Sequence, residues 1–243
     1  MKNLALAILF AISVLSAGER SPVMAELFTS EGCSSCPPAD ALLAQLDAAQ
    51  PVNGARIVVL SEHVDYWDDL GWKDPFSSSQ FSERQRGYAR RLRLDSVYTP
   101  QLVIDGHDQY VGGDARKIID GITRAAVNAK SPVHIGSVQR QGSQAAVEID
   151  APALDPSAKV GQAELWIAIA SDRETSQVRR GENSGRNLTH VSVARELRKI
   201  GTVTRSKGLN QTIHLPVNGS GRIIAFLQEP NQGAIAGTDE KNF

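Results

Sequence analysis

Two cysteines, Cys33 and Cys36, constrain the fold of this chain more than any other feature, and they are its only cysteines. A segment typical of a strand, residues 22–29, precedes them, and apolar residues at helical spacing follow them from Ala39 onwards. A dithiol between a strand and a helix is typical of redox chemistry, because the helix start favours a thiolate and the spacing keeps the second thiol within reach. The sequence therefore predicts a reactive dithiol at the start of a helix.

The two thiols are expected to have different roles. We assign Cys33 as the attacking thiol, since it should lie nearer the exposed end of the helix with free backbone N–H groups around it, and Cys36 as the resolving thiol. Pro37 and Pro38 follow directly, and a residue before proline is pushed away from helical angles. The helix can therefore begin at Pro37 or Pro38 rather than at Cys33, in which case Cys33 gains less from the helix dipole.

Two other interpretations of the cysteine pair stay open. A structural disulfide over so short a loop would stabilise the fold by only about 2 kcal/mol, against about 4.7 kcal/mol for a loop of 100 residues. A metal site would combine Cys33 and Cys36 with a further ligand such as His63, because zinc usually takes four ligands. The redox interpretation requires no cofactor.

The N-terminus has the layout of a signal peptide. Lys2 supplies a basic tip, an apolar run interrupted only by Ser13 covers residues 4–15, and small residues follow up to Ala17 and Gly18. The alternative, a membrane anchor, would need an apolar stretch of about 20 residues. We expect residues 1–17 to be removed, so that the mature chain is periplasmic or secreted and spans no membrane. Disulfides form and persist in that environment.

Periodicity divides the chain into two parts. Up to about Asn128 the predicted order is strand, helix, strand, helix, strand, strand, helix, which is the thioredoxin order with an antiparallel edge hairpin. We therefore predict an α/β thioredoxin-like domain over residues 21–129. After a linker at 129–132, short alternating segments separated by turns predict an all-β, sandwich-like domain over 132–230, and then an irregular tail over 231–243. The polar stretch 179–190 is either a docking loop or an ordinary hairpin connection.

Two segments are expected to meet the dithiol. Thr99–Pro100 precedes a strand at the place where thioredoxin-like proteins carry a cis-proline, and a cis bond would expose the Thr99 backbone to a substrate peptide. His63, Asp65 and Trp67 leave the carboxyl end of a second parallel strand, and such loops gather at one sheet edge.

Each of these neighbours has a less specific interpretation. His63 could shuttle protons or bind a metal, or it and Asp65 could satisfy each other. Trp67 could simply pack. Glu26, on the strand before the dithiol, could accept a proton from Cys36 or face solvent.

Charge limits the classes of partner. The chain has 26 basic and 27 acidic side chains, so it lacks the basic excess of a nucleic-acid-binding domain. An arginine cluster at 84–93 is expected to form one solvated helix face.

Four motifs resemble one family. They are E-L-F-T-S-E-G-C-S-S-C-P-P-A-D at 26–40, H-V-D-Y-W-D-D-L-G-W-K-D-P-F at 63–76, Y-T-P-Q-L-V-I-D-G at 98–106 and G-E-N-S-G-R-N-L-T-H at 181–190. With them the chain resembles a family of bacterial exported thioredoxin-like proteins known only as a domain of unknown function. The resemblance implies a thioredoxin-like fold and a periplasmic location in Gram-negative bacteria. The Ser-Ser spacer differs from the Gly-Pro of thioredoxins and the Pro-His of strongly oxidising relatives, which leaves the direction of the redox reaction open.

The leading functional prediction is a thiol–disulfide oxidoreductase that acts on exported protein or small-molecule thiols and disulfides. In it, Cys33 attacks, Cys36 resolves, and Thr99 with Pro100 shapes the substrate groove. Two alternatives are a copper or other metal-binding protein that uses Cys33, Cys36 and His63, and a non-catalytic scaffold with an inert disulfide. The sequence predicts no oligomeric state.

Overall fold

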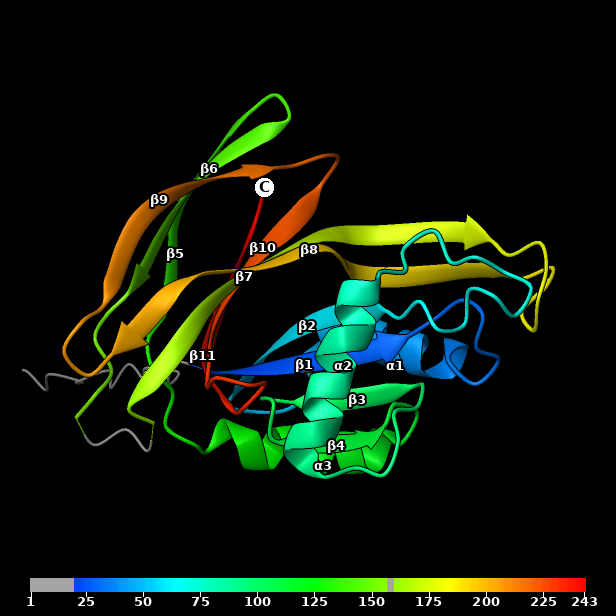
Figure 1. Cartoon of the computed structure of the whole chain (residues 1–243), viewed down its shortest axis with the longest axis horizontal. Helices are drawn as coiled ribbons and strands as arrows, with labels where there is room; N and C mark the ends of the chain where they lie inside the picture. The colour runs from blue at the N-terminus through cyan, green and yellow to red at the C-terminus, as the bar shows by residue number, and fades with distance from the viewer. Residues whose placement is uncertain (1–19, 157–159) are drawn as a thin grey trace, which may run out of the picture.

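A mixed sheet of eight strands runs through the protein in the order β11-β10-β7-β8-β2-β1-β3-β4, and a second sheet has the order β5-β6-β9 (Figure 1). The structure, a computed structural model, describes residues 20–156 and 160–243. The predicted signal peptide, 1–17, lies outside these residues. Within the described part, no helix combines the length and the apolar character needed to cross a membrane.

The N-terminal part follows the predicted order of elements. Its strands are β1 (Ser21–Thr29), β2 (Ala55–His63), β3 (Gln101–Ile104) and β4 (Asp108–Val111), and its helices are α1 (Pro37–Ala49), α2 (Ser79–Leu92) and α3 (Ala115–Ala126). Strand β1 runs parallel to β2 and antiparallel to β3, and β4 forms the antiparallel edge. The thioredoxin-like arrangement predicted for this part is therefore present.

Strand β1 is buried on both faces because helices cover both. Leu27 and its neighbours on one face pack with residues of α1 and α3, such as Leu43 and Ile118. On the other face, Phe28 packs with Tyr88 of α2. This double burial explains why β1 and β2 read as continuous apolar runs rather than as alternating ones.

The helix starts follow local sequence signals. Helix α1 begins at Pro37, with Cys36 as its N-cap residue, as the double proline predicted. The side chains of Ser78 and Asp114 accept hydrogen bonds from backbone N–H groups in the first turns of α2 and α3. The dithiol thus lies just before the helix rather than inside it.

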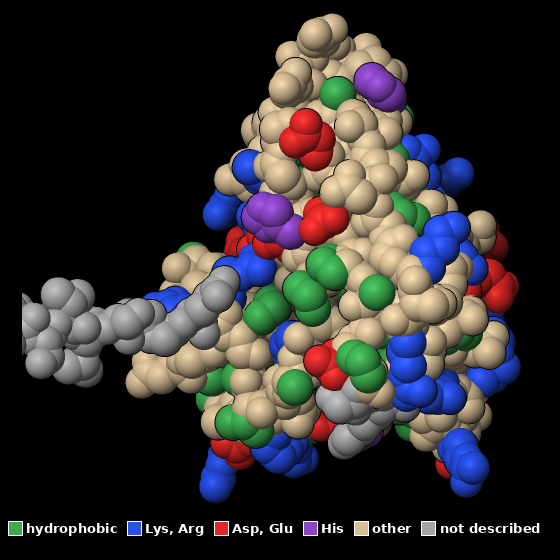
Figure 2. All heavy atoms as spheres, turned by 90° about the vertical axis from the view of Figure 1, so that its left-hand side faces the viewer, with side chains coloured by type: hydrophobic (Ala, Val, Ile, Leu, Met, Phe, Trp, Pro, Cys, Tyr) green, Lys and Arg blue, Asp and Glu red, His purple; other side chains and the backbone are tan. Residues whose placement is uncertain are grey.

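The C-terminal part is all-β. It contains β5 (His134–Gln141), β6 (Gln144–Ala151), β7 (Gln162–Gln177), β8 (Asn187–Thr204), β9 (Leu209–Pro216), β10 (Gly221–Gln228) and β11 (Ile235–Asn242). The three-stranded sheet packs on one half of the large sheet around an apolar core that includes Val147, Leu165 and Ile223. Figure 2 shows acidic and basic side chains interspersed on this end of the molecule, away from the dithiol.

The two parts share the large sheet. Strand β8 pairs parallel to β2 at Ser61 and Val193, so the C-terminal strands continue the thioredoxin-like sheet past the linker predicted at 129–132. The domain boundaries themselves stay a prediction. The irregular tail predicted for 231–243 is wrong, because β11 pairs along β10 from Arg222 with Asn242 to Gln228 with Ile235. The sequence of β11 did not indicate a strand, because it is rich in polar residues and its apolar and polar residues alternate only weakly.

Candidate functional site

The two cysteines form a disulfide with their Cα atoms 5.4 Å apart. Cys33 occupies a turn after β1, while Cys36 sits at the N-cap of α1. Both cysteines are fully buried, whereas Ser34 and Ser35 between them are exposed. The Cys33 sulfur lies 3.3 Å from the Ser35 hydroxyl oxygen. The positive end of α1 therefore acts on Cys36 more directly than on Cys33.

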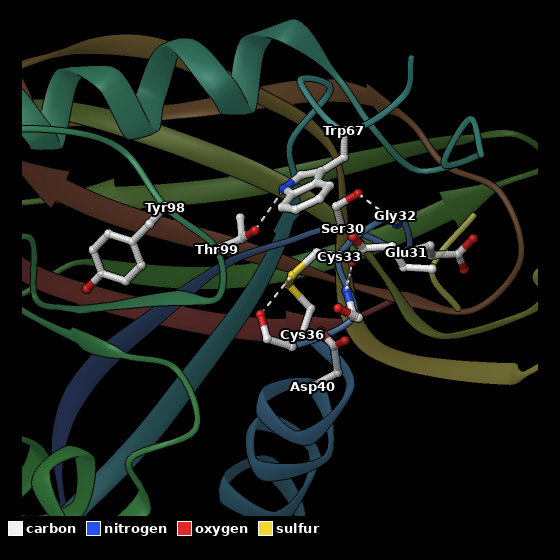
Figure 3. Close-up of a disulfide and its surroundings, with 12 residues drawn as sticks. Ser30, Glu31, Gly32, Cys33, Cys36, Asp40, Trp67, Tyr98 and Thr99 are labelled. Carbon is white, nitrogen blue, oxygen red and sulfur yellow. Dashed lines mark hydrogen bonds between the residues drawn. A yellow bond between two sulfur atoms is a disulfide. The ribbon is translucent and has the colours of Figure 1, made fainter. Parts of the chain in front are cut away.

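Trp67 and Thr99 border the disulfide, as Figure 3 shows. The Trp67 indole N–H donates to the Thr99 hydroxyl at 2.9 Å. A Cβ atom on Gly32 would lie 3.0 Å from the Trp67 Cβ, a tight contact that a larger residue could make only if Trp67 moved slightly. The Thr99–Pro100 peptide bond is cis, as predicted. The indole thus bridges the turn that carries Cys33 and the cis-proline loop.

A buried histidine, His190 on β8, lies behind the dithiol between two carboxylates. Its Nε2 is 3.3 Å from Glu31 Oε1, and its Nδ1 is 3.6 Å from Asp40 Oδ1. Burial by itself would lower the pKa of His190, but the neighbouring carboxylates of Asp40 and Glu31 outweigh it and raise the pKa to about 10. At neutral pH this site therefore holds an imidazolium.

Glu31 also accepts hydrogen bonds from neutral donors. The Trp72 indole N–H donates to its Oε2 at 2.8 Å, and the Ser176 hydroxyl donates to its Oε1. Trp72 in the loop after β2, Ser176 on β7 and His190 on β8 thereby hold the Glu31 carboxylate, which immediately precedes Gly32 and Cys33 in the chain.

His63 pairs with Asp74, not with Asp65. The His63 Nδ1 and Asp74 Oδ2 are 2.7 Å apart and fully buried, and the His63 ring packs edge-on against His190 at 4.6 Å between centroids. Burial would raise the pKa of Asp74, but His63 and two backbone N–H donors lower it. Asp65 instead accepts a hydrogen bond from Ser82 of α2. The predicted interaction between His63 and Asp65 is therefore wrong, because the His63 ring pairs with Asp74 and the Asp65 carboxylate pairs with Ser82.

The tip of the β7–β8 hairpin closes over the dithiol turn. The Asn183 side-chain amide donates to the backbone oxygens of Glu31 and Cys33, both at 2.9 Å. The Ser34 backbone N–H donates in turn to Glu182 Oε2 at 3.0 Å. In Figure 1 this hairpin, the yellow one, extends from the C-terminal strands to the end of the sheet where α1 begins. The polar stretch 179–190 thus docks within the chain itself.

Glu26 does not lie beside Cys36. It is fully buried on the face of β1 that α2 covers, where it pairs with Arg84 at 2.6 Å and accepts a hydrogen bond from Tyr88. Arg84 is buried as well, so the predicted solvated face of arginines is wrong at this position. Burial raises the pKa of neighbouring Glu62 well above its ordinary value, and the charge of Glu26 adds to this effect although Arg84 opposes it.

The alternative metal set of Cys33, Cys36 and His63 is not assembled. The two sulfurs are bonded to each other, and His63 Nδ1 is taken by Asp74. Over residues 20–156 and 160–243, no group of three or more His, Cys, Asp or Glu side chains is arranged to hold a metal ion.

The sequence reasoning missed several residues that surround the dithiol. They are Glu31, Asp40, Asp74, Glu182, Asn183 and His190. All of them fall inside the four motifs quoted above, and buried polar side chains need partners. The many acidic, amide and histidine side chains in those motifs could have indicated a buried polar network around the dithiol.

Comparisons with known proteins place the chain in a family and support its fold. The sequence model of a family described as "Protein of unknown function (DUF1223)" matches residues 24–228. The chain is 31% identical to protein AGR_C_4864 of Agrobacterium tumefaciens, whose crystal structure superposes with a TM-score of 0.69 and covers 92% of this chain and 95% of that one. HBP35 of Porphyromonas gingivalis is 11% identical, with a TM-score of 0.66 over 91% of this chain and 75% of its own, so it supports the fold alone. No curated protein matches the sequence.

Proposed function

Because this chain belongs to the DUF1223 family, whose function is unknown, we propose a function from its site: thiol–disulfide exchange with exported protein or small-molecule thiols. One observation carries the proposal. A disulfide between Cys33 and Cys36 lies at the start of α1, beside a cis-proline loop that borders it in three dimensions but is distant in sequence. A purely structural disulfide of this span would add little stability.

The proposed exchange proceeds in two steps. A substrate thiolate attacks the Cys33 sulfur, the Cys33–Cys36 bond breaks, and a mixed disulfide forms on Cys33. A second substrate thiol then releases Cys33, so that the substrate is oxidised and the dithiol is reduced. The reverse sequence oxidises the dithiol at the expense of a substrate disulfide. We place this activity in the periplasm or outside the cell, where the signal-peptide layout of residues 1–17 would direct the chain.

Substrate access requires a local movement. Both cysteines are fully buried, and Trp67 borders the turn that carries Cys33. The Thr99 hydroxyl holds the indole through one hydrogen bond of 2.9 Å. A peptide that pairs with the Thr99 backbone would compete for this position, so substrate binding and uncovering of Cys33 are coupled in this proposal.

A mixed-disulfide trap tests the function. We expect the reduced Cys36→Ser variant, treated with glutathione disulfide, to retain one glutathione on Cys33 by intact-mass spectrometry. The matched Cys33→Ser variant should retain less, because Cys36 is the N-cap residue behind the turn.

The wild-type disulfide should in addition equilibrate with glutathione redox buffers while the protein stays folded. A disulfide that resists dithiothreitol in the folded protein, together with no adduct on Cys33, would show an inert structural bond instead.

A further inference from the structure

Four buried polar atoms behind the dithiol have no hydrogen-bond partner among the described residues. They are Thr29 Oγ1, Asp40 Oδ1, His63 Nε2 and His190 Nδ1. Thr29 and His63 end two paired parallel strands, Asp40 lies in the first turn of α1, and His190 lies on β8. Buried polar groups are normally paired, so unpaired ones next to a reactive group call for a functional explanation.

Asp40 is the member of this group that the fold places next to Cys36. Its backbone N–H donates to the Cys36 carbonyl at 3.1 Å, which puts the two residues one helical turn apart. Side chains four residues apart lie on the same helix face. Figure 3 shows the Asp40 side chain pointing from α1 toward the disulfide. Its Oδ1 is 3.6 Å from His190 Nδ1.

We propose that Asp40 and His190 form a buried proton-transfer pair for the Cys36 sulfur. The pair supplies a proton to this sulfur when the disulfide is reduced and takes the proton back when the disulfide re-forms. This inference rests on the proposed exchange function. His190 acts through Asp40 and is a positioning residue, whereas Asp40 faces the reacting sulfur.

The proton balance explains why such a pair is needed. When a substrate thiolate attacks Cys33, the electron pair of the broken S–S bond stays on Cys36 as a thiolate. Cys36 is fully buried, and a buried unpaired charge is strongly unfavourable. The Asp40 carboxylate receives a proton from the His190 imidazolium and passes it to Cys36. The second exchange step leaves Cys33 as a thiolate, which takes its proton from solvent, and His190 regains its proton from solvent as well. Overall the substrate loses two electrons and two protons, and the dithiol gains two of each.

The surroundings of His190 suit it to this role. Glu31 fixes its Nε2 at 3.3 Å, so Nδ1 is directed toward Asp40. His63, already bonded to Asp74, packs against the ring, and the cross-strand neighbour Glu174 pairs with Arg195. Glu31 and Asp40 raise the His190 pKa to about 10, so the imidazolium is populated at neutral pH and can act as the proton donor.

The test is the pH dependence of disulfide reduction by dithiothreitol. The rate constant is divided by the concentration of dithiothreitol thiolate, and it is measured for the wild type, Asp40→Asn and His190→Gln. We expect a wild-type value that stays constant and then falls as pH rises through about 10. Both variants should be slower at pH 7 by about 10²-fold and should show no such fall.

Glu62→Gln provides the matched control. Glu62 is a buried carboxyl next to His63 in the chain, but it pairs with Arg84 on the other face of the sheet. The reduction rate of Glu62→Gln and its pH dependence should therefore equal those of the wild type. If His190→Gln fails to fold by circular dichroism, Asp40→Asn alone decides. A folded Asp40→Asn variant with the wild-type rate and profile overturns the proton-transfer pair and leaves the exchange function intact. A wild-type disulfide that dithiothreitol does not reduce overturns both.

Discussion

The side-chain amide of Asn183 lies 2.9 Å from the backbone oxygen of Cys33, although 150 residues separate the two along the chain. This hydrogen bond ties the tip of the β7–β8 hairpin to the turn that carries the dithiol. A second bond from the same amide, to the backbone oxygen of Glu31, makes the contact bidentate. The C-terminal part therefore completes the dithiol site rather than merely adjoining it.

Removing this amide should destabilise the protein. Asn183→Ala removes a donor from two backbone carbonyl oxygens, and that of Cys33 still accepts from the Cys36 N–H whereas that of Glu31 loses its side-chain donor, a loss that costs about 1–3 kcal/mol for a buried group. We expect a lower urea midpoint with an unchanged slope. Asn187→Ala, an exposed asparagine at the start of β8, is the control and should change stability by less than about 0.5 kcal/mol. Equal effects of the two substitutions would argue against the hairpin contact.

The charge of His190 should make stability depend on pH. Its pKa is raised in the folded state from 6.5 to about 10, so the folded state binds this proton more tightly than the unfolded state does. The resulting stabilisation, of order 5 kcal/mol, is complete below about pH 6.5 and is lost as pH rises through about 10.

Urea unfolding of the wild type and His190→Gln between pH 6 and pH 10 measures this effect. The stability difference between the two proteins should shrink as pH rises, because other groups contribute equally to both. A difference that is constant over this range would show that His190 is neutral in the folded protein.

Trp67 should control access to the dithiol. If displacing the indole accounts for about 1.4 kcal/mol of the barrier, Trp67→Ala should be reduced by a small dithiol about tenfold faster than the wild type. Trp67→Phe keeps an aromatic ring there but loses the hydrogen bond to Thr99, so its rate should lie between the two. Stopped-flow mixing with dithiothreitol provides the rates, and identical rates for all three proteins would exclude a covering role.

Arg84 should be among the residues most important for stability on α2. It pairs with Glu26 and bonds to Tyr88 and Gln228, all of them buried. Arg84→Met leaves the Glu26 carboxylate buried without its partner, which typically costs about 3–5 kcal/mol. Arg86→Met is the matched control on the same helix, because Arg86 makes only an exposed ion pair with Glu83. Thermal unfolding of both variants checks this contrast.

Which arginine of α2 is buried could not be predicted from the sequence. Arg84 and Arg86 differ by two positions on one helix, and nothing in their local sequence distinguishes them. Arg84 is buried because helix periodicity turns it toward Glu26 and Glu62, which lie on strands more than twenty residues away. Glu26 was a candidate proton acceptor for Cys36 by distance along the chain, but strand alternation sends its side chain to the opposite face from α1. The acceptor role is better suited to Asp40, on the helix itself.

Three features of the N-terminal part were predictable from the sequence: the order of its elements, a start of α1 at Pro37 or Pro38, and a cis peptide bond before Pro100. Apolar periodicity and proline geometry act over a few residues and so give the elements and the helix start, whereas the cis bond was expected from the position of Pro100 in the strand–helix order. Which polar groups surround Cys33 and Cys36 depends instead on contacts between segments distant in the chain. His190 and Asn183 reach the dithiol from another part of the chain, and such contacts depend on how β8 pairs with β2 in the shared sheet.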